Sequence, residues 1–187
     1  DNDVNQINAN GESLLLAAVA SSSFNSISAI ISHPSFNPIK SMATQAFFLC
    51  LIKSPNNLSL FIGTDFIDVN QSYNEDFSFC HGSLAQLKDI NDYDFNSNMS
   101  NTLVGWTPLM ISGIMPDTID FLLNARDIDI NRKGSNGSAP IFVALTYKHS
   151  LLEKLLENPK LDINIQDSRG YTPLITALRN VDFPNAL

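Results

Sequence analysis

Apolar residues recur along this chain in short clusters with helical spacing, and the clusters return at a fixed interval. Three stretches share a glycine, a proline and a following apolar residue: Gly105–Leu109, Gly137–Ile141 and Gly170–Leu174. Their prolines lie 32 and 33 residues apart. An aspartate–apolar–asparagine triplet, at 129–131 and 162–164, ends six residues before the second and third glycines. A period of about 33 residues predicts a stacked array of small repeats.

Each period predicts two short helices and an extended exit. Thr107-Pro108 favours a helix start, because a threonine can cap and proline is tolerated in the first turn. Pro116-Asp117 breaks this helix, and a second one follows with Ile119, Leu122 and Leu123. The next period predicts helices over 140–146 and 150–156 and an exit over 161–164. Units of this size cannot bury their apolar faces alone, so they must stack.

The pattern resembles that of the ankyrin repeat family, in which Gly-x-Thr-Pro-Leu is followed by Leu-Leu and then Asp-Val-Asn. The resemblance is strong over 101–180 and weaker over 1–70, where it rests on Gly11–Ala18, Ile30-Ile31, Ala46–Cys50, Phe61-Ile62 and Asp68–Asn70. It implies an all-α solenoid of helix–turn–helix units joined by short β-hairpin loops.

The resemblance divides the chain into one repeat domain with a break in its middle. The expected units are 1–10 (partial), 11–40, 41–70, 101–133, 134–166 and 167–187 (partial). Residues 71–100 fit poorly, and we interpret them as a degenerate repeat or an irregular insertion with a long loop. Both ends fall inside a unit, so we expect a piece of a longer protein.

Charge and composition narrow the classes of partner. The chain carries 11 basic and 19 acidic side chains, a net charge of −8, which argues against nucleic acid as a partner. An acidic first half favours a partner with a basic surface. Two cysteines are too few for a disulfide framework, so a reducing, cytoplasmic location is expected. No apolar run approaches the roughly 20 residues that span a bilayer, so no membrane insertion is expected in this segment.

The candidates for chemistry are weak, and we expect no enzyme, cofactor or metal. Cys80-His81 is the sharpest pair, but adjacent side chains point apart and no supporting motif surrounds them. The segment 92–97 begins like a calcium loop, yet Ser97 and Leu103 stand where that loop needs glycine and glutamate. The triplet asparagines are expected to bond local backbone in the loop turns: Asn5, Asn70, Asn131 and Asn164.

The most informative surface positions follow the repeated glycine, where the resemblance implies contact with partners. Exposed aromatic residues there suit interface anchors, although Trp106 could instead pack over the irregular segment before it. The positions in this register are Trp106, Tyr171, Ser138 and Glu12. Neighbouring candidates in the hairpins are Asn136, Arg169, Arg132 and Lys133, and those at first-helix ends are Met115, Tyr147 and Arg179.

We therefore expect a protein–protein interaction module that binds through a concave surface of hairpins and first helices. The alternative is a regulatory or spacer segment of a larger enzyme, channel or secreted effector whose activity lies outside these residues.

Overall fold

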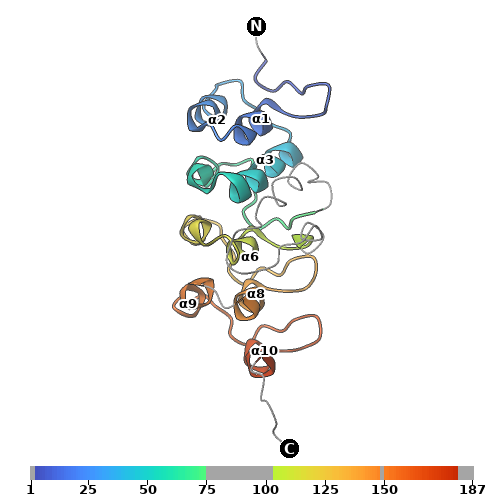
Figure 1. The fold of residues 1–187 in the computed structure, drawn as a ribbon, viewed down its shortest axis with the longest axis vertical. Coiled ribbons are helices and arrows are strands. Elements are labelled where there is room, and N and C mark those ends of the chain that lie inside the picture. Colours follow the sequence, from blue (N-terminus) through green and yellow to red (C-terminus); the bar gives the residue numbers. More distant parts are fainter. Residues whose placement is uncertain (1–2, 75–102, 148–149, 181–187) are drawn as a thin grey trace, which may run out of the picture.

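Every regular element in the described part of the chain is a helix. The structure, a computed structural model, describes residues 3–74, 103–147 and 150–180, and Figure 1 shows their helices in successive layers along the long axis. An all-α class is therefore found within these ranges. The elements are α1 (Leu14–Ala20), α2 (Phe24–Ile31), α3 (Lys40–Lys53), the 3₁₀ helix η1 (Pro55–Leu60), α6 (Pro108–Ser112), the 3₁₀ helix η3 (Pro116–Thr118), α7 (Ile119–Leu123), α8 (Pro140–Tyr147), α9 (Ser150–Leu156) and α10 (Pro173–Asn180).

The helices form two columns, with the connecting loops beside one of them (Figure 1). In the central column α1, α3, α6, α8 and α10 follow one another, and each contacts the next. The other column contains α2, η1, η3 with α7, and α9. Each layer thus covers the apolar face of its neighbour, which short helices need for burial.

Local sequence signals account for the starts of the first helices. Thr107 accepts a hydrogen bond from the Met110 N–H at 3.4 Å, and Ser13 accepts one from the Leu16 N–H at 3.1 Å. Proline occupies the first helical position of α6, α8 and α10. These positions agree with the helix starts that the Thr-Pro motif predicts.

The second helix of the 41–70 stretch differs from the prediction. Phe61 and Ile62 stand for the Leu-Leu pair of the family pattern, and the resemblance therefore implies that they lie inside it, but η1 ends at Leu60 and Phe61 is its C-cap residue. Pro55 starts this 3₁₀ helix one residue after the C-cap residue of α3, and Gly63, with φ of 85°, turns the chain out of it. Phe61 remains fully buried, so the apolar position is kept although the helix is short.

The predicted β-hairpins are turns rather than strands. Within the described ranges no residue forms a strand, and one isolated antiparallel bridge joins Ile7 and Ser13. The loops at 8–12, 134–138 and 167–171 are each closed by two backbone hydrogen bonds, too few for a ladder. In the 134–138 loop, the Gly134 N–H donates to the Ser138 carbonyl and the Gly137 N–H donates to the Gly134 carbonyl, both at 2.9 Å.

The same loop closure recurs along the stack, with one large difference in length. The loops at 8–12 and 167–171 repeat the two bonds of the 134–138 loop. Between α3 and α6 the pattern returns, because the Tyr73 N–H donates to the Trp106 carbonyl at 2.7 Å and the Gly105 N–H donates to the Tyr73 carbonyl at 2.8 Å. The other loops have two residues between the paired positions, whereas 31 residues separate Tyr73 from Gly105.

Tyr73 and Gly105 are held firmly where this long segment leaves and returns. Tyr73 is fully buried, and its ring meets that of Phe48 edge-on at 5.4 Å between centroids. Phe47 and Phe61 extend the same aromatic cluster. A Cβ atom on Gly134 would lie 1.8 Å from the Gly105 carbonyl oxygen, so the next loop packs directly against this point.

The aspartate of each triplet supplies the local turn chemistry. The Asp129 carboxylate accepts a hydrogen bond from the Asn131 N–H at 3.0 Å. Asp3, Asp68 and Asp162 make the same bond to the residue two positions later, each at 2.9 Å. This role was expected of the asparagine side chains, and that expectation was wrong for the three that reach the next layer.

Those asparagine side chains join consecutive layers. Asn131 donates through Nδ2 to the Lys160 carbonyl at 2.7 Å and accepts through Oδ1 from the Asp162 N–H at 2.8 Å. We call this two-bond contact the asparagine clasp. It recurs at Asn5, which bonds Ser35 and Asn37, and at Asn70, which bonds Asp127 and Asp129. Each clasp satisfies one carbonyl and one amide of the following loop.

Candidate functional site

The described residues form a cleft between two loops and two first helices at the C-terminal half of the stack. Its volume is about 430 Å³. We call it the α8–α10 cleft. The residues that line it are Trp106, Asn136, Ser138, Phe142, Val143, Thr146, Tyr147, Asp167, Ser168, Arg169 and Thr176.

The apolar wall of the cleft is formed by aromatic residues that are themselves packed. The Trp106 and Tyr147 rings meet edge-on, with centroids 5.9 Å apart, and Phe142 lies in the same wall. Trp106 is only 6% exposed, so the expectation of an exposed anchor at this position is corrected. Its backbone is paired with Tyr73 and its ring packs on Tyr147, so Trp106 lines the cleft as a buried wall residue.

Met115 is also buried rather than exposed. It lies between α6 and η3 with 7% of its surface accessible, and its carbonyl accepts a hydrogen bond from the Thr118 hydroxyl at 2.7 Å. Met115 therefore contributes to the core and does not line the α8–α10 cleft.

The polar wall is built from two loops whose side chains fix their own backbones. The Asn136 Oδ1 accepts from the Ser138 N–H at 3.0 Å. In the next loop the Asp167 carboxylate accepts from the Tyr171 N–H at 2.9 Å and from the Arg169 N–H at 2.8 Å. The bond from the Tyr171 amide, with the Arg169 contacts, lowers the pKa of Asp167, so this carboxylate is ionised at neutral pH.

Two guanidinium groups flank one aromatic ring beside the cleft. The Arg169 carbon Cζ lies 5.4 Å from the centroid of the Tyr171 ring, and that of Arg179 lies 4.6 Å from it. Both distances fall in the range of cation–π contacts. Arg169 also donates to Asp167 through Nε at 3.3 Å. Tyr171 is therefore half-buried between cations rather than a freely exposed anchor.

Glu12, Arg132 and Lys133 do not line the cleft. Glu12 lies near the opposite end of the stack, where its carboxylate accepts from the Asn8 amide at 2.7 Å. Arg132 and Lys133 are exposed in the loop that also carries Asn136 and Ser138. The sequence thus pointed to five lining residues: Trp106, Asn136, Ser138, Tyr147 and Arg169.

Sequence reasoning missed the other lining positions. Phe142, Val143 and Thr146 lie on the α8 face that also carries Tyr147, and their helical spacing could have found them. Asp167 and Ser168 precede Arg169 in its loop. Thr176 shares α10 with Arg179 and carried no signal of its own.

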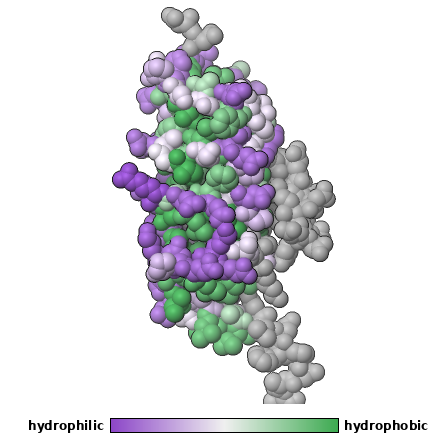
Figure 2. All heavy atoms as spheres, turned by 90° about the vertical axis from the view of Figure 1, so that its left-hand side faces the viewer, coloured by the Kyte–Doolittle hydropathy of each residue, from purple (hydrophilic) through white to green (hydrophobic). Residues whose placement is uncertain are grey.

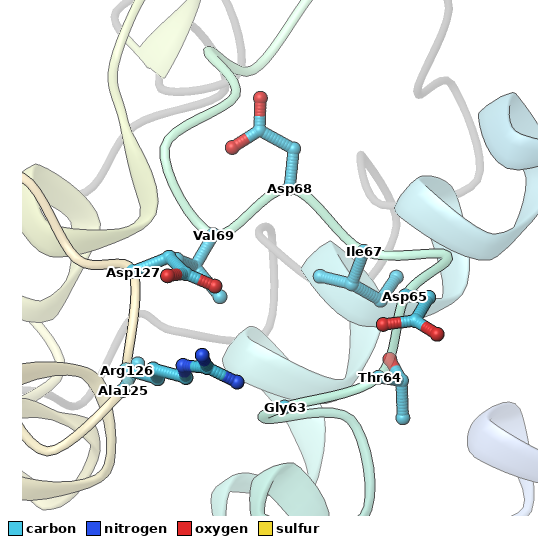
Figure 3. Close-up of a pocket in the computed structure, with 9 residues that line it drawn as sticks. All are labelled: Gly63, Thr64, Asp65, Ile67, Asp68, Val69, Ala125, Arg126 and Asp127. Atoms are coloured by element: carbon cyan, nitrogen blue, oxygen red, sulfur yellow. The ribbon is translucent and has the colours of Figure 1, made fainter.

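A second cleft, of about 350 Å³, lies between the Gly63–Val69 loop and the Ala125–Asp127 turn. Figure 3 shows the Arg126 side chain reaching from one side toward Thr64 and Asp65 on the other, with the Asp127 carboxylate beside it. Within the described residues Arg126 makes no ion pair. Charged and polar groups dominate this cleft, and none of the binding-site residues predicted from the sequence lines it.

The second-helix side offers a third, more apolar groove. Figure 2 shows apolar residues between hydrophilic ones on this face and a further apolar group toward the C-terminal end. The groove holds Ile62 and Phe121 and has a volume of about 300 Å³. Nearby, Lys154 and Asp120 form an ion pair between α9 and α7.

The groups considered for chemistry lie mostly outside the described residues. Cys80, His81 and the segment 92–97 fall outside them. Among the residues that are described, no three His, Cys, Asp or Glu side chains are grouped as a metal site would need. Cys50 is a buried free thiol, and burial raises its pKa to about 12, which suits core packing and not nucleophilic attack.

None of the helices in the described ranges is both long enough and apolar enough to cross a membrane.

Comparison with known proteins gives limited likeness. No model of a known protein family matches the chain. A stretch of 77 residues, 40% of the chain, is 27% identical to Rabankyrin-5 from Mus musculus, a protein that contains ankyrin repeats. The chain spans only 6% of the length of that relative. The likeness agrees with the ankyrin resemblance of the sequence and hints at a repeat domain for protein interaction.

Proposed function

We propose that the chain is an ankyrin-type repeat array that binds another protein through its loops and first helices and catalyses no reaction. The observation that carries the proposal is the α8–α10 cleft. Five of the residues predicted from the repeat pattern line it, two from the register after the glycine and three neighbouring candidates, with an aromatic wall on one side and polar loops on the other. Clefts of this size and mixed lining are typical of binding sites.

The proposal includes the units expected from the sequence, namely 11–40, 41–70, 101–133 and 134–166, with partial units at 1–10 and 167–187. Three regularities support it: the two-column layers, the shared loop closure and the asparagine clasp. The clasp spans 29 and 31 residues at Asn131 and 30 and 32 at Asn5, which matches one unit.

We further propose that residues 71–100 belong to an insertion at a loop tip and not to a stacked unit. The clasp of Asn70 spans 57 and 59 residues, so the layer of α3 meets the layer of α6 directly. The loop closure at Tyr73 and Gly105 supports the same view, because the 29 additional residues enter between positions that correspond to the paired positions of the 8–12, 134–138 and 167–171 loops. A degenerate unit would have needed a layer of its own.

A cytoplasmic location stays part of the proposal. It rests on the low cysteine content and on Cys50 being a buried free thiol, which a reducing compartment preserves.

The alternative, a regulatory or spacer segment of a larger protein, draws support from apolar side chains that stay exposed toward the two ends of the stack. Leu14 and Phe24 are 46% and 49% exposed, and Leu174 and Leu178 are 68% and 54% exposed. Further units would cover such residues. The sequence that flanks this chain in its gene distinguishes the two possibilities.

Substitution of Thr146 by arginine tests the binding face. Thr146 is exposed on α8 and lines the cleft, so an arginine there fills it with little effect on the core. Asn25→Arg on the exposed side of α2 adds the same charge far from the cleft and serves as the control. Trp106→Ala is a poorer test, because removing a buried tryptophan costs about 3–5 kcal/mol of stability.

The measurement is affinity capture from cell extract with the wild-type chain and both variants, beside thermal unfolding of each. We expect at least one protein that the wild type and Asn25→Arg retain and Thr146→Arg loses, with unfolding temperatures unchanged. Identical capture by all three would refute the assignment of this face.

A further inference from the structure

The charge of the binding face differs from that of the whole chain. The chain has a net charge of −8, yet α8 carries no charged side chain and α10 carries only Arg179. The loops at 131–138 and 164–171 add three cations and one anion. Within the described residues, the charged side chains of α10 and of these two loop segments are therefore Arg132, Lys133, Arg169, Arg179 and Asp167, a net charge of +3. The carboxylates of Asp129 and Asp162, just before the two segments, accept hydrogen bonds from the Asn131 and Asn164 amides.

The carboxylate that lines the cleft is already engaged. Asp167 accepts hydrogen bonds from two backbone amides and from the Arg169 side chain. Among the residues that the structure describes, Arg132, Lys133 and Arg179 make no ion pair, and all three are exposed. The cations are thus free to meet charges from another molecule.

The cleft beside these cations suits one large apolar side chain. Its wall is formed by Trp106, Phe142, Val143 and Tyr147, and its volume is about 430 Å³. The rings are fixed by mutual packing, so an inserted group costs little rearrangement of the wall. Anchors of this kind, surrounded by charged rim contacts, are typical of interface hot spots.

We infer that the partner of this face is an acidic protein segment that places one aromatic or large aliphatic side chain in the α8–α10 cleft, with its carboxylates against Arg132, Lys133, Arg169 and Arg179. The inference rests on the proposed function and specifies its partner. It replaces the expectation of a basic partner, which followed from the acidic first half of the chain. At physiological salt, screening acts over about 8 Å, so the nearby cations dominate at the cleft.

Selection from a random peptide library displayed on phage, with residues 1–187 as bait, tests this inference. We expect the enriched peptides to share several Asp or Glu residues around one aromatic or large aliphatic residue. The best of them, made synthetically, has its Kd measured against the wild type and three variants. These are Arg132→Glu/Lys133→Glu, the cleft variant Thr146→Arg and the control Asn25→Arg.

Charge reversal should weaken binding by at least about tenfold and reduce its salt dependence, because two attractive rim charges become repulsive. Thr146→Arg should abolish binding, and Asn25→Arg should leave the Kd unchanged.

Four results would overturn the inference, and they differ in what they imply for the proposed function. If the enriched peptides are neutral or basic, and Thr146→Arg abolishes their binding while charge reversal does not, the cleft remains the binding site but its partner is not acidic. If Thr146→Arg does not affect peptide binding, both the cleft as the binding site and the acidic partner are refuted. If no acidic sequence is enriched, the occupant is not an acidic protein segment. The same conclusion follows if a single-stranded RNA oligonucleotide at equal concentration displaces the peptide.

Discussion

The asparagine clasp predicts that one side chain stabilises the joint between two layers. Substitution of Asn131 by alanine removes a hydrogen bond of 2.7 Å to the Lys160 carbonyl and one of 2.8 Å from the Asp162 amide. A hydrogen bond contributes about 0.5–1.5 kcal/mol net. Both bonds lie near solvent, which can solvate the groups left behind. We therefore expect Asn131→Ala to lower the free energy of unfolding by about 1–2 kcal/mol.

Asn164 provides a matched control within the same chain. Its amide N–H bonds Asp162 at 2.9 Å, as the Asn131 N–H bonds Asp129. Within the described residues, however, the Asn164 side chain has no partner in a following layer. Asn164→Ala should therefore change stability by less than about 0.5 kcal/mol.

Asn131→Asp tests the donor half of the clasp. It keeps the acceptor for the Asp162 amide but places an oxygen toward the Lys160 carbonyl, so it should destabilise the chain at least as much as Asn131→Ala.

Urea unfolding followed by circular dichroism measures these differences, and calorimetry should show Asn131→Ala melting roughly 5 °C lower. The reasoning fails if Asn164→Ala is as destabilising as Asn131→Ala, since the cost would then come from the local turn. It also fails if Asn131→Ala is neutral.

Three further predictions follow from the loops and the core. Gly134→Ala should lower the free energy of unfolding in urea by about 2 kcal/mol or more, because its Cβ would lie 1.8 Å from the Gly105 carbonyl oxygen. Gly170→Ala, with open space around it and φ of 79°, should lower it by about 1 kcal/mol. Equal costs would contradict the close packing at Gly134. Replacing residues 75–102 by a short glycine–serine linker should preserve the helical circular dichroism and cooperative unfolding, and loss of folding would indicate a stacked unit instead. In a Cys80→Ser chain, Cys50 should react with a thiol reagent only on unfolding. Burial raises the pKa of Cys50 to about 12, so the free energy of unfolding should fall as pH rises above about 9, where the thiol of the unfolded chain ionises. If the free energy of unfolding of the Cys50→Ala control does not fall in this range, the pH dependence belongs to Cys50.

The helical layers could be predicted from the sequence because their signals are local. Thr107 and Pro108 mark a helix start within two residues, and the triplets recur at a constant offset. The candidate face was found in part for the same reason, since Ser138 occupies the register after the glycine and Tyr147 ends a helix beside it.

What the sequence could not predict depends on contacts between distant residues. Trp106 is buried through the backbone of Tyr73, 33 positions earlier, and through the ring of Tyr147. The task of Asn131 depends on a loop 29 to 31 positions later, so the triplet alone suggested only turn chemistry. The local charge of the binding face likewise depends on which loops the stack brings together, and the net charge of the chain averages that information away.

One position where a clasping asparagine is expected holds an apolar residue instead, so one joint of the stack has no asparagine clasp. Asn37 receives the clasp of Asn5 as Asp162 receives that of Asn131, so Ile39 stands where the next clasping asparagine would be. Ile39 cannot join the layer of α1 to the loop after η1. On the opposite edge, Ser22 and Ser54 share a hydroxyl contact of 2.6 Å, and Lys53 donates to the Ala20 carbonyl. In an array whose stability is a sum of neighbour couplings, the strength of this joint then depends on its other contacts. At the loop edge these include the rings of Phe36 and Phe66, whose centroids lie 5.4 Å apart, so an aromatic pair takes the place of the clasp between the α1–α2 layer and the layer of α3.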